Sequence, residues 1–298
     1  MIKQTYSILK VSKAVWILFF TIVLGSSVKA NPFADTAKKK FLAAVSVKDN
    51  PRFITLEPNV VFPEVLSGNE AGALDYVEKF STNRRAYLIR TYNRSKKYFP
   101  KATAILKKYN LPQELKVLLA LESAFNANAV SSAGAVGYWQ IMDEVAKEYG
   151  LKYVAWEKED KKKKDIKLAV TDKKSPKPAP AKDDRKNFNK STYAAARYLK
   201  DRSRNLDNNL LLMVASYNCG IGNVWEAMKK TGKANPGFWD IKAYLPAETQ
   251  SYVMNFMALN VVFHNYEKFT SNTLLFTPTK VKAENLEGKT AEQTTSLD

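Results

Sequence analysis

The chain has 298 residues, of which 45% are hydrophobic and 26% are charged. This length suits one large domain or two small ones, and this apolar content can build a packed core, which excludes a wholly disordered chain. Cys219 is the only cysteine. An intrachain disulfide is therefore excluded, and stability must come from packing.

The first thirty residues have the order of a secretory signal. Three lysines precede an apolar run at residues 14–24, and compact residues follow the run up to Ala30. The run is shorter than the about 20 residues that a membrane-spanning helix needs. We therefore predict that residues 1–30 are a signal peptide, that it is removed near Ala30, and that the protein is exported to the periplasm or cell envelope. A retained N-terminal anchor is the alternative.

The charge of the chain also bears on its partners. Removal of residues 1–30 takes four lysines and no acidic residue from the formal charge of +18, which leaves +14. Such a charge in a cytosolic protein would suggest nucleic acid. For an exported protein we expect no nucleic acid, and an anionic envelope polymer or membrane surface as the electrostatic partner.

After the signal, an irregular segment precedes a series of predicted helices. Prolines and Gly68 interrupt residues 31–84, which we treat as an N-terminal extension. Residues 82–109 predict two helices separated by Pro100. A further helix should start with Asn110 as its cap and Pro112 in its first turn. One face of that helix carries Leu115, Leu118, Leu119, Glu122 and Phe125.

The second half of the chain is also read as helical, apart from one insert. Residues 158–182 hold ten lysines, four acids and three prolines, which predicts a solvated loop, with an electrostatic tether as the alternative. An apolar helix should end at Asn218, a glycine turn through Gly220 and Gly222 should follow, and another apolar helix should begin at Pro246. Residues 269–298 read as a loose tail. No strand pattern is long enough to demand a major sheet, so the fold class is mostly α.

Glu122 is an anomaly because it interrupts an apolar stripe. Burial among leucines raises the pKa of a carboxyl group, and a raised pKa makes it a proton donor near neutral pH. The alternative is a glutamate whose head reaches solvent at the helix end. Two glycines, Ser131, Gln140 and the aromatic pair Tyr138-Trp139 follow it. Glycines permit close backbone approach and aromatic rings offer faces for sugars, so together they suggest a glycan cleft.

The residues that zinc sites and catalytic triads require are missing from the sequence. His264 and Cys219 are the only histidine and cysteine, and no HExxH, GxSxG or CxxC spacing occurs. We therefore expect no metal site and no cofactor.

The stretch from Glu122 to Met142, "ESAFNANAVSSAGAVGYWQIM", resembles the catalytic motif of the soluble-lytic-transglycosylase (SLT) type of goose-lysozyme-like domain. Five further elements of the family follow in order, at 149–151, 183–185, 191–199, 215–224 and 246–253: "YGL", "DDR", "STYAAARYL", "ASYNCGIGNV" and "LPAETQSYV". The spacing is most similar to that of the membrane-bound lytic transglycosylase D group. The resemblance covers roughly residues 85–265, and it implies a lysozyme-like domain at 85–268 that contains the insert.

The resemblance implies cleavage of the MurNAc-β-1,4-GlcNAc bond of peptidoglycan with formation of 1,6-anhydromuramyl ends. One glutamate acts as acid and then as base in that family, and Glu122 matches it. The positions that match the family's substrate-contacting residues are Ser131, Gln140, Met142, Tyr217, Asn218, Glu248 and Tyr252.

The chain also departs from the family pattern. Cys219 replaces the usual alanine or serine, and the lysine-rich insert is longer than usual. We also expect no LysM-type module after the domain. Two other functions stay open: a hydrolytic muramidase on the same fold, and a catalytically silent wall-binding protein.

Overall fold

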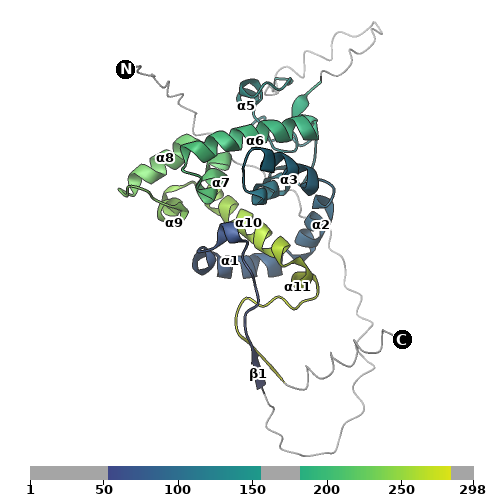
Figure 1. Ribbon diagram of the computed structural model, residues 1–298, viewed down its shortest axis with the longest axis vertical. Helices are drawn as coiled ribbons and strands as arrows, with labels where there is room; N and C mark the ends of the chain where they lie inside the picture. Colours follow the sequence, from purple (N-terminus) through teal and green to yellow (C-terminus); the bar gives the residue numbers. More distant parts are fainter. Residues whose placement is uncertain (1–52, 156–181, 283–298) are drawn as a thin grey trace, which may run out of the picture. The chain divides into compact units, whose positions relative to one another are not determined.

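A computed structural model describes residues 53–155 and 182–282 of the chain (Figure 1). The predicted signal peptide and nearly all of the lysine-rich insert lie outside these residues, as does the end of the predicted tail. Within the described ranges, no helix combines the length and the apolar character that crossing a bilayer requires.

The described residues fall into two compact units. The smaller unit contains two antiparallel strands, β1 (Phe53–Leu56) and β2 (Thr279–Lys282), in which Phe53 pairs with Lys282 and Leu56 with Thr279. The expectation of a loose tail from residue 269 is therefore wrong for residues 279–282. Each strand has only four residues, too few for a recognisable alternating pattern, and each gains its hydrogen bonds from a partner more than two hundred residues away.

The larger unit, within residues 61–273, is built from helices, so the prediction of a mostly α fold is confirmed. Its α-helices in chain order are α1 (Glu70–Asn83), α2 (Arg85–Ser95), α3 (Phe99–Lys108), α4 (Leu118–Ser123), α5 (Asp143–Glu148), α6 (Phe188–Asn205), α7 (Leu210–Cys219), α8 (Ile221–Lys230), α9 (Phe238–Ile241), α10 (Ala247–His264) and α11 (Tyr266–Thr270). Short 3-10 helices join them: η1 (Glu64–Leu66), η2 (Gln113–Val117), η4 (Asp184–Lys186) and η5 (Lys242–Tyr244).

Helix α10 runs through the centre of this unit, with α7 packed against one part of it and α1 against another (Figure 1). It begins after Pro246, as predicted, and its apolar residues from Val253 to Val262 are buried around the whole circumference. A helix that is apolar on every side is stable only when other helices surround it. Tyr76 of α1 donates a hydrogen bond to Asn255 of α10 at 2.6 Å.

Three details of the helix boundaries differ from the sequence expectations. Asn110 does not cap a new helix: its φ is +51° and its N–H bonds to the carbonyl of Lys107, so it ends α3. Pro100 lies in the first turn of α3, where its missing N–H costs nothing. Gly222 lies inside α8, so Gly220 alone makes the turn between α7 and α8.

The helix predicted to carry Glu122 is also shorter than expected. Residues 113–117 form the tighter 3-10 helix η2, and only the six residues of α4 are α-helical. Leu115, Leu118 and Leu119 are nevertheless fully buried. The apolar stripe therefore predicted burial correctly, although not a single continuous helix.

Candidate active site

Helix α4 places Glu122 in its last turn, next to an abrupt change of chain direction. Ala124 and Phe125 follow with φ of +47° and +65°, a left-handed conformation that is costly for residues other than glycine. The Phe125 ring is buried and stacks on Tyr98 with centroids 5.2 Å apart. Packing of Phe125 thus stabilises a turn that leaves Glu122 at the exposed end of a buried helix.

Burial raises the pKa of the Glu122 carboxyl to about 7. The Tyr252 hydroxyl, from α10, donates a hydrogen bond to Glu122 Oε1 and opposes this rise, while the charge of Glu248 adds to it. The Glu122 residue as a whole is half-buried. A carboxyl group with this pKa is partly protonated at neutral pH, as a general acid must be.

Two tyrosines from different helices flank this carboxyl. Burial raises the pKa of Tyr217 and of Tyr252 well above the usual range, and the nearby Glu122 contributes to both shifts. Their hydroxyls are therefore neutral donors at any physiological pH. The Tyr217 hydroxyl donates to the carbonyl of Trp139 at 2.7 Å.

Residues 129–141 form a tight loop beside Glu122, held by isolated β-bridges between Val130 and Val136 and between Val136 and Ile141. The Ser123 hydroxyl donates to the carbonyl of Tyr138 at 2.8 Å, next to the carbonyl that Tyr217 binds. Hydroxyls from α4 and α7 thus fasten this loop through two consecutive carbonyl oxygens.

Trp139 corrects the expectation of a sugar-stacking platform. Its side chain is 0% exposed, and its Nε1–H donates to Thr192 of α6 at 2.9 Å. Tyr138 is half-buried, with its ring against Tyr98 and Phe188. These aromatic residues join the loop to the helical core. A sequence pattern cannot distinguish such a role from sugar binding, because both require a large flat apolar face.

Ser131 and Gln140 use part of their hydrogen-bonding capacity inside the same loop. The Ser131 hydroxyl accepts from the N–H of Ala135 at 2.9 Å. Gln140 Nε2 donates to the carbonyls of Ala129 and Gly137 at 3.2 and 2.9 Å. In these bonds the Gln140 side-chain oxygen Oε1 and the Ser131 O–H donor are not used. Contact of either residue with a sugar stays a prediction.

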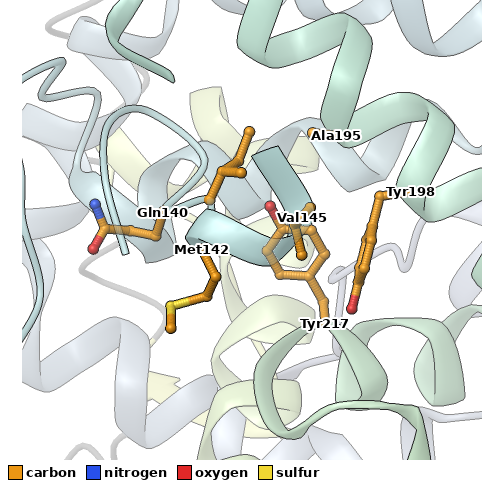
Figure 2. Close-up of a pocket in the computed structure, with 7 residues that line it drawn as sticks. Gln140, Met142, Val145, Ala195, Tyr198 and Tyr217 are labelled. Atoms are coloured by element: carbon orange, nitrogen blue, oxygen red, sulfur yellow. The ribbon is translucent and has the colours of Figure 1, made fainter. Parts of the chain in front are cut away.

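A pocket of about 80 Å³ lies between this loop, α5, α6 and α7 (Figure 2). Its walls are formed by Gln140, Ile141, Met142, Val145, Ala195, Tyr198 and Tyr217. Three of the residues proposed from the sequence, Gln140, Met142 and Tyr217, are thus brought together. No sequence pattern singles out Val145, Ala195 or Tyr198, although the last two lie in the quoted "STYAAARYL" element.

Asn218 and Glu248 lie at the junction of α7 and α10. Asn218 Oδ1 accepts a hydrogen bond from the Thr249 hydroxyl at 2.7 Å, and Glu248 stays exposed in the first turn of α10. Partial loss of solvent around the Glu248 carboxyl nevertheless raises its pKa. Because its charge acts on Glu122, Glu248 is a second carboxylate near the candidate acid, which the sequence did not indicate. Among the described residues, no group of three acidic, His or Cys side chains could hold a metal ion.

Comparisons with known proteins find similar chains among the lytic transglycosylases. The chain is 31% identical over 195 residues to the membrane-bound lytic murein transglycosylase D of Escherichia coli K12, a match that covers 64% of this chain and 37% of that protein. The chain thus spans little more than a third of the relative's length.

Two solved structures are similar with lower identity. The lytic transglycosylase Slt of Pseudomonas aeruginosa is 18% identical with a TM-score of 0.42, over 69% of this chain and 36% of that one. The 70 kDa soluble lytic transglycosylase of Escherichia coli is 17% identical with a TM-score of 0.41, over 74% of this chain and 39% of that one.

The family comparison is the most specific of these findings. The transglycosylase SLT domain model matches residues 100–237, a range that begins in α3, includes Glu122 and the loop beside it, and ends before α9. Residues 100–237 of this chain are therefore similar to the transglycosylase SLT domain.

Proposed function

We propose that the protein is a peptidoglycan lytic transglycosylase that cleaves the MurNAc-β-1,4-GlcNAc bond. The observation that carries this proposal is the Glu122 carboxyl, whose pKa burial raises to about 7 and whose Oε1 accepts a hydrogen bond from Tyr252. The SLT family match and the name of the 31% identical relative support the same substrate.

In the proposed reaction, Glu122 acts twice. Protonated Glu122 donates its proton to the glycosidic oxygen while the bond from that oxygen to muramyl C1 breaks. The Glu122 carboxylate then accepts the proton of the muramyl C6 hydroxyl, whose oxygen bonds to C1 and closes the 1,6-anhydro ring. Glu122 is thereby protonated again, and no water is consumed.

The surrounding side chains support each step. The Tyr252 hydroxyl orients the Glu122 carboxyl and stabilises its ionised form after the first proton transfer. We assign Ser131, Gln140 and Met142 to contacts with the muramyl unit, and Tyr217, Asn218 and Glu248 to the wall of the cleft. This assignment follows the family motif, and it is consistent with the pocket that Gln140, Met142 and Tyr217 share.

We further propose that the protein is exported and acts in the periplasm or cell envelope. The N-terminal signal pattern supports export, and the charge of +14 that remains after residue 30 favours association with the anionic envelope.

Replacement of the acid tests the proposal directly. Glu122→Gln keeps the shape and the hydrogen-bond acceptor for Tyr252 but cannot donate or accept the reacting proton, so we expect no release of soluble muropeptides from purified peptidoglycan. The matched control is Glu226→Gln, because Glu226 is an exposed glutamate of α8 that pairs with Lys230. Normal release by a cooperatively folding Glu122→Gln variant would refute the assignment.

A hydrolytic muramidase is the second candidate, and Glu248 is the observation that favours it. Most glycosidases use two carboxylates, one of which can activate water, and Glu248 acts electrostatically on Glu122. Mass spectrometry of the released muropeptides separates the two reactions, because an anhydro end is lighter than a reducing end by one water. Products with mainly reducing ends would establish the hydrolase.

A further inference from the structure

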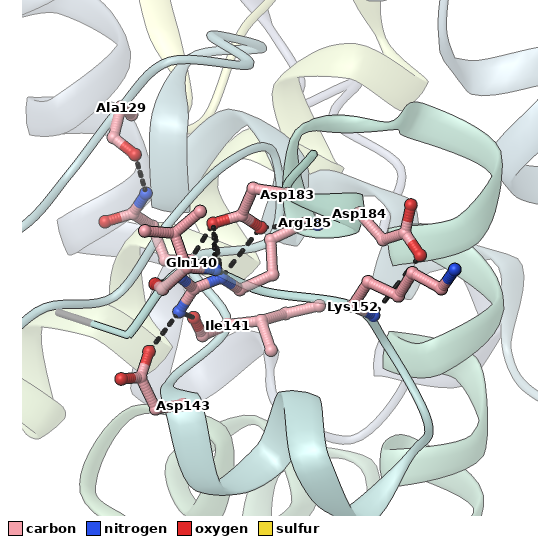
Figure 3. A network of polar contacts seen from close by, with 9 residues as sticks. Ala129, Gln140, Ile141, Asp143, Lys152, Asp183, Asp184 and Arg185 are labelled. Carbon is pink, nitrogen blue, oxygen red and sulfur yellow. Dashed lines mark hydrogen bonds and ion pairs between the residues drawn. The ribbon is translucent and has the colours of Figure 1, made fainter. Parts of the chain in front are cut away.

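Arg185 is a buried cation that lies directly after the lysine-rich insert, in η4. Its side chain is 1% exposed, yet it is surrounded by oxygen acceptors from three segments of the chain (Figure 3). Nε and Nη2 bind Asp183 at 3.0 and 2.8 Å, and Nη2 also donates to the carbonyl of Val154 at 2.7 Å. Nη1 binds the Asp143 carboxylate at 2.5 Å and the carbonyl of Ile141 at 3.3 Å.

One of these acceptors, Ile141, lines the pocket, and another, Asp143, follows the lining residue Met142. Ile141 and Asp143 are the neighbours of Met142 in the chain, and Ile141 and Met142 both line the pocket. The Arg185 guanidinium therefore holds the main chain on one side of Met142 and a side chain on the other. Its planar, multiple-donor geometry suits this task, and the single ammonium of lysine could not reproduce it.

The backbone of Arg185 also contacts the loop, at Gly137. A Cβ atom on Gly137 would lie 2.2 Å from the carbonyl oxygen of Arg185, and the φ of Gly137 is +82°. The loop can approach Arg185 this closely only because residue 137 has no side chain. Gly137 in turn accepts a hydrogen bond from Gln140 Nε2. The contacts of Arg185 thus reach residues on both sides of the Gln140–Met142 segment.

A second set of hydrogen bonds joins residues 152–154 to residues 183–185. These bonds do not reach the loop at residues 129–141. The N–H of Asp184 donates to the carbonyl of Lys152 at 2.7 Å, and the Lys152 N–H donates to the Asp184 carboxylate at 3.2 Å. Asp184 also pairs with Lys190 of α6 at 2.9 Å. Asp183 and Asp184 are adjacent and both buried, but only the network of Asp183 continues to the loop. Asp184 is therefore a matched control position.

We propose that Arg185 is a positioning residue for glycan binding, which fixes Gln140 and Met142 in the pocket through Ile141, Asp143 and Gly137. This inference rests on the proposed function, since the ligand of the pocket is taken to be the glycan strand. Arg185 itself contacts no substrate in this role. Its loss displaces the pocket wall and leaves the Glu122–Tyr252 pair unaltered.

The test measures glycan affinity in a variant that cannot cleave the glycan. In a Glu122→Gln background, binding of uncrosslinked GlcNAc–MurNAc strands is measured by calorimetry for Arg185→Lys, Asp143→Asn and Asp184→Asn. We expect Kd to rise about tenfold for Arg185→Lys and Asp143→Asn, because small misplacements of binding groups are costly. Asp184→Asn should lower the unfolding temperature and leave Kd unchanged.

The active protein gives a second readout. With Glu122 present, Arg185→Lys and Asp143→Asn should raise KM and leave the pH dependence of kcat unchanged, which a general loss of folded protein would not do. Asp143→Asn covers the case in which Arg185→Lys does not fold, since the Asp143 side chain is 24% exposed and its replacement keeps the buried guanidinium.

Each outcome decides between clear alternatives. Unchanged Kd in the folded variants, or an equal rise of Kd in Asp184→Asn, would refute the positioning role while the proposed function stands. Absence of glycan turnover by the unsubstituted protein would refute the proposed function, and this inference with it.

Discussion

Replacement of Glu122 by glutamine should stabilise the protein at alkaline pH and have much less effect at acid pH. Burial raises the pKa of Glu122 from its usual value of 4.5 to about 7 in the folded protein. Below the lower value, both the folded and unfolded states carry a protonated Glu122. Between the two values the unfolded state loses its proton while the folded state keeps it, so wild-type stability falls as pH rises.

The size of the effect follows from this pKa difference. Each pKa unit corresponds to about 1.4 kcal/mol, so the shift amounts to about 3 kcal/mol once the pH exceeds the folded-state pKa. Glutamine has no charge to lose, and the variant avoids this penalty. For a domain of this size, about 3 kcal/mol corresponds to a rise of about 6–12 °C in the unfolding temperature.

The assay compares Glu122→Gln with wild type by urea unfolding at a series of pH values from acid to alkaline. Both proteins share every other titrating group, so the difference between their free energies of unfolding isolates Glu122. Glu226→Gln serves as the matched control for loss of a carboxylate at the surface. A difference that is the same at acid and alkaline pH would refute the reasoning, because Glu122 would then ionise equally in both states.

Two further predictions concern the tyrosine partner and two glycines. Tyr252→Phe removes a hydrogen bond that lowers the pKa of Glu122, so that pKa should rise and the alkaline limb of the kcat/KM profile should move to higher pH; a shift to lower pH would contradict this. Gly72→Ala should lower the unfolding temperature, because a Cβ there would lie 2.7 Å from the Trp239 ring. Gly222 lies inside α8, and a Cβ there would meet nothing within 4 Å, so Gly222→Ala should stabilise the protein by up to about 1 kcal/mol. Calorimetric scans of both variants check this pair, and equal shifts would show that the Trp239 contact is unimportant.

The sequence was most informative where apolar periodicity is strong. Helix α10 begins after Pro246 as predicted, and burial of Leu118 and Leu119 follows from the stripe that contains Glu122. Periodicity specifies which face is buried but not how tightly the helix is wound. The 3-10 geometry of η2 and the left-handed Ala124 were therefore missed.

Roles that depend on distant partners were less accessible from the sequence. Tyr252 is 130 residues from Glu122, and its assignment to the site came from the family motif rather than from any local pattern. The sequence suggests a sugar platform at Trp139, because spacing alone cannot reveal the hydrogen bond from Trp139 to Thr192. Arg185 was visible in the "DDR" element, but its acceptors at Ile141 and Asp143 come from another segment of the chain.

The two carbonyl anchors of the loop beside Glu122 have a consequence for variation of the cleft. Ser123 and Tyr217 fasten this loop through the backbone oxygens of residues 138 and 139, atoms that every amino acid possesses. Substitutions at Met142 or Val145 therefore remove neither attachment. A combinatorial library at these two positions, which follow the loop and line the pocket, would therefore vary the pocket wall and keep the loop attached. If the proposed function holds, these positions are suitable for evolving new glycan specificity.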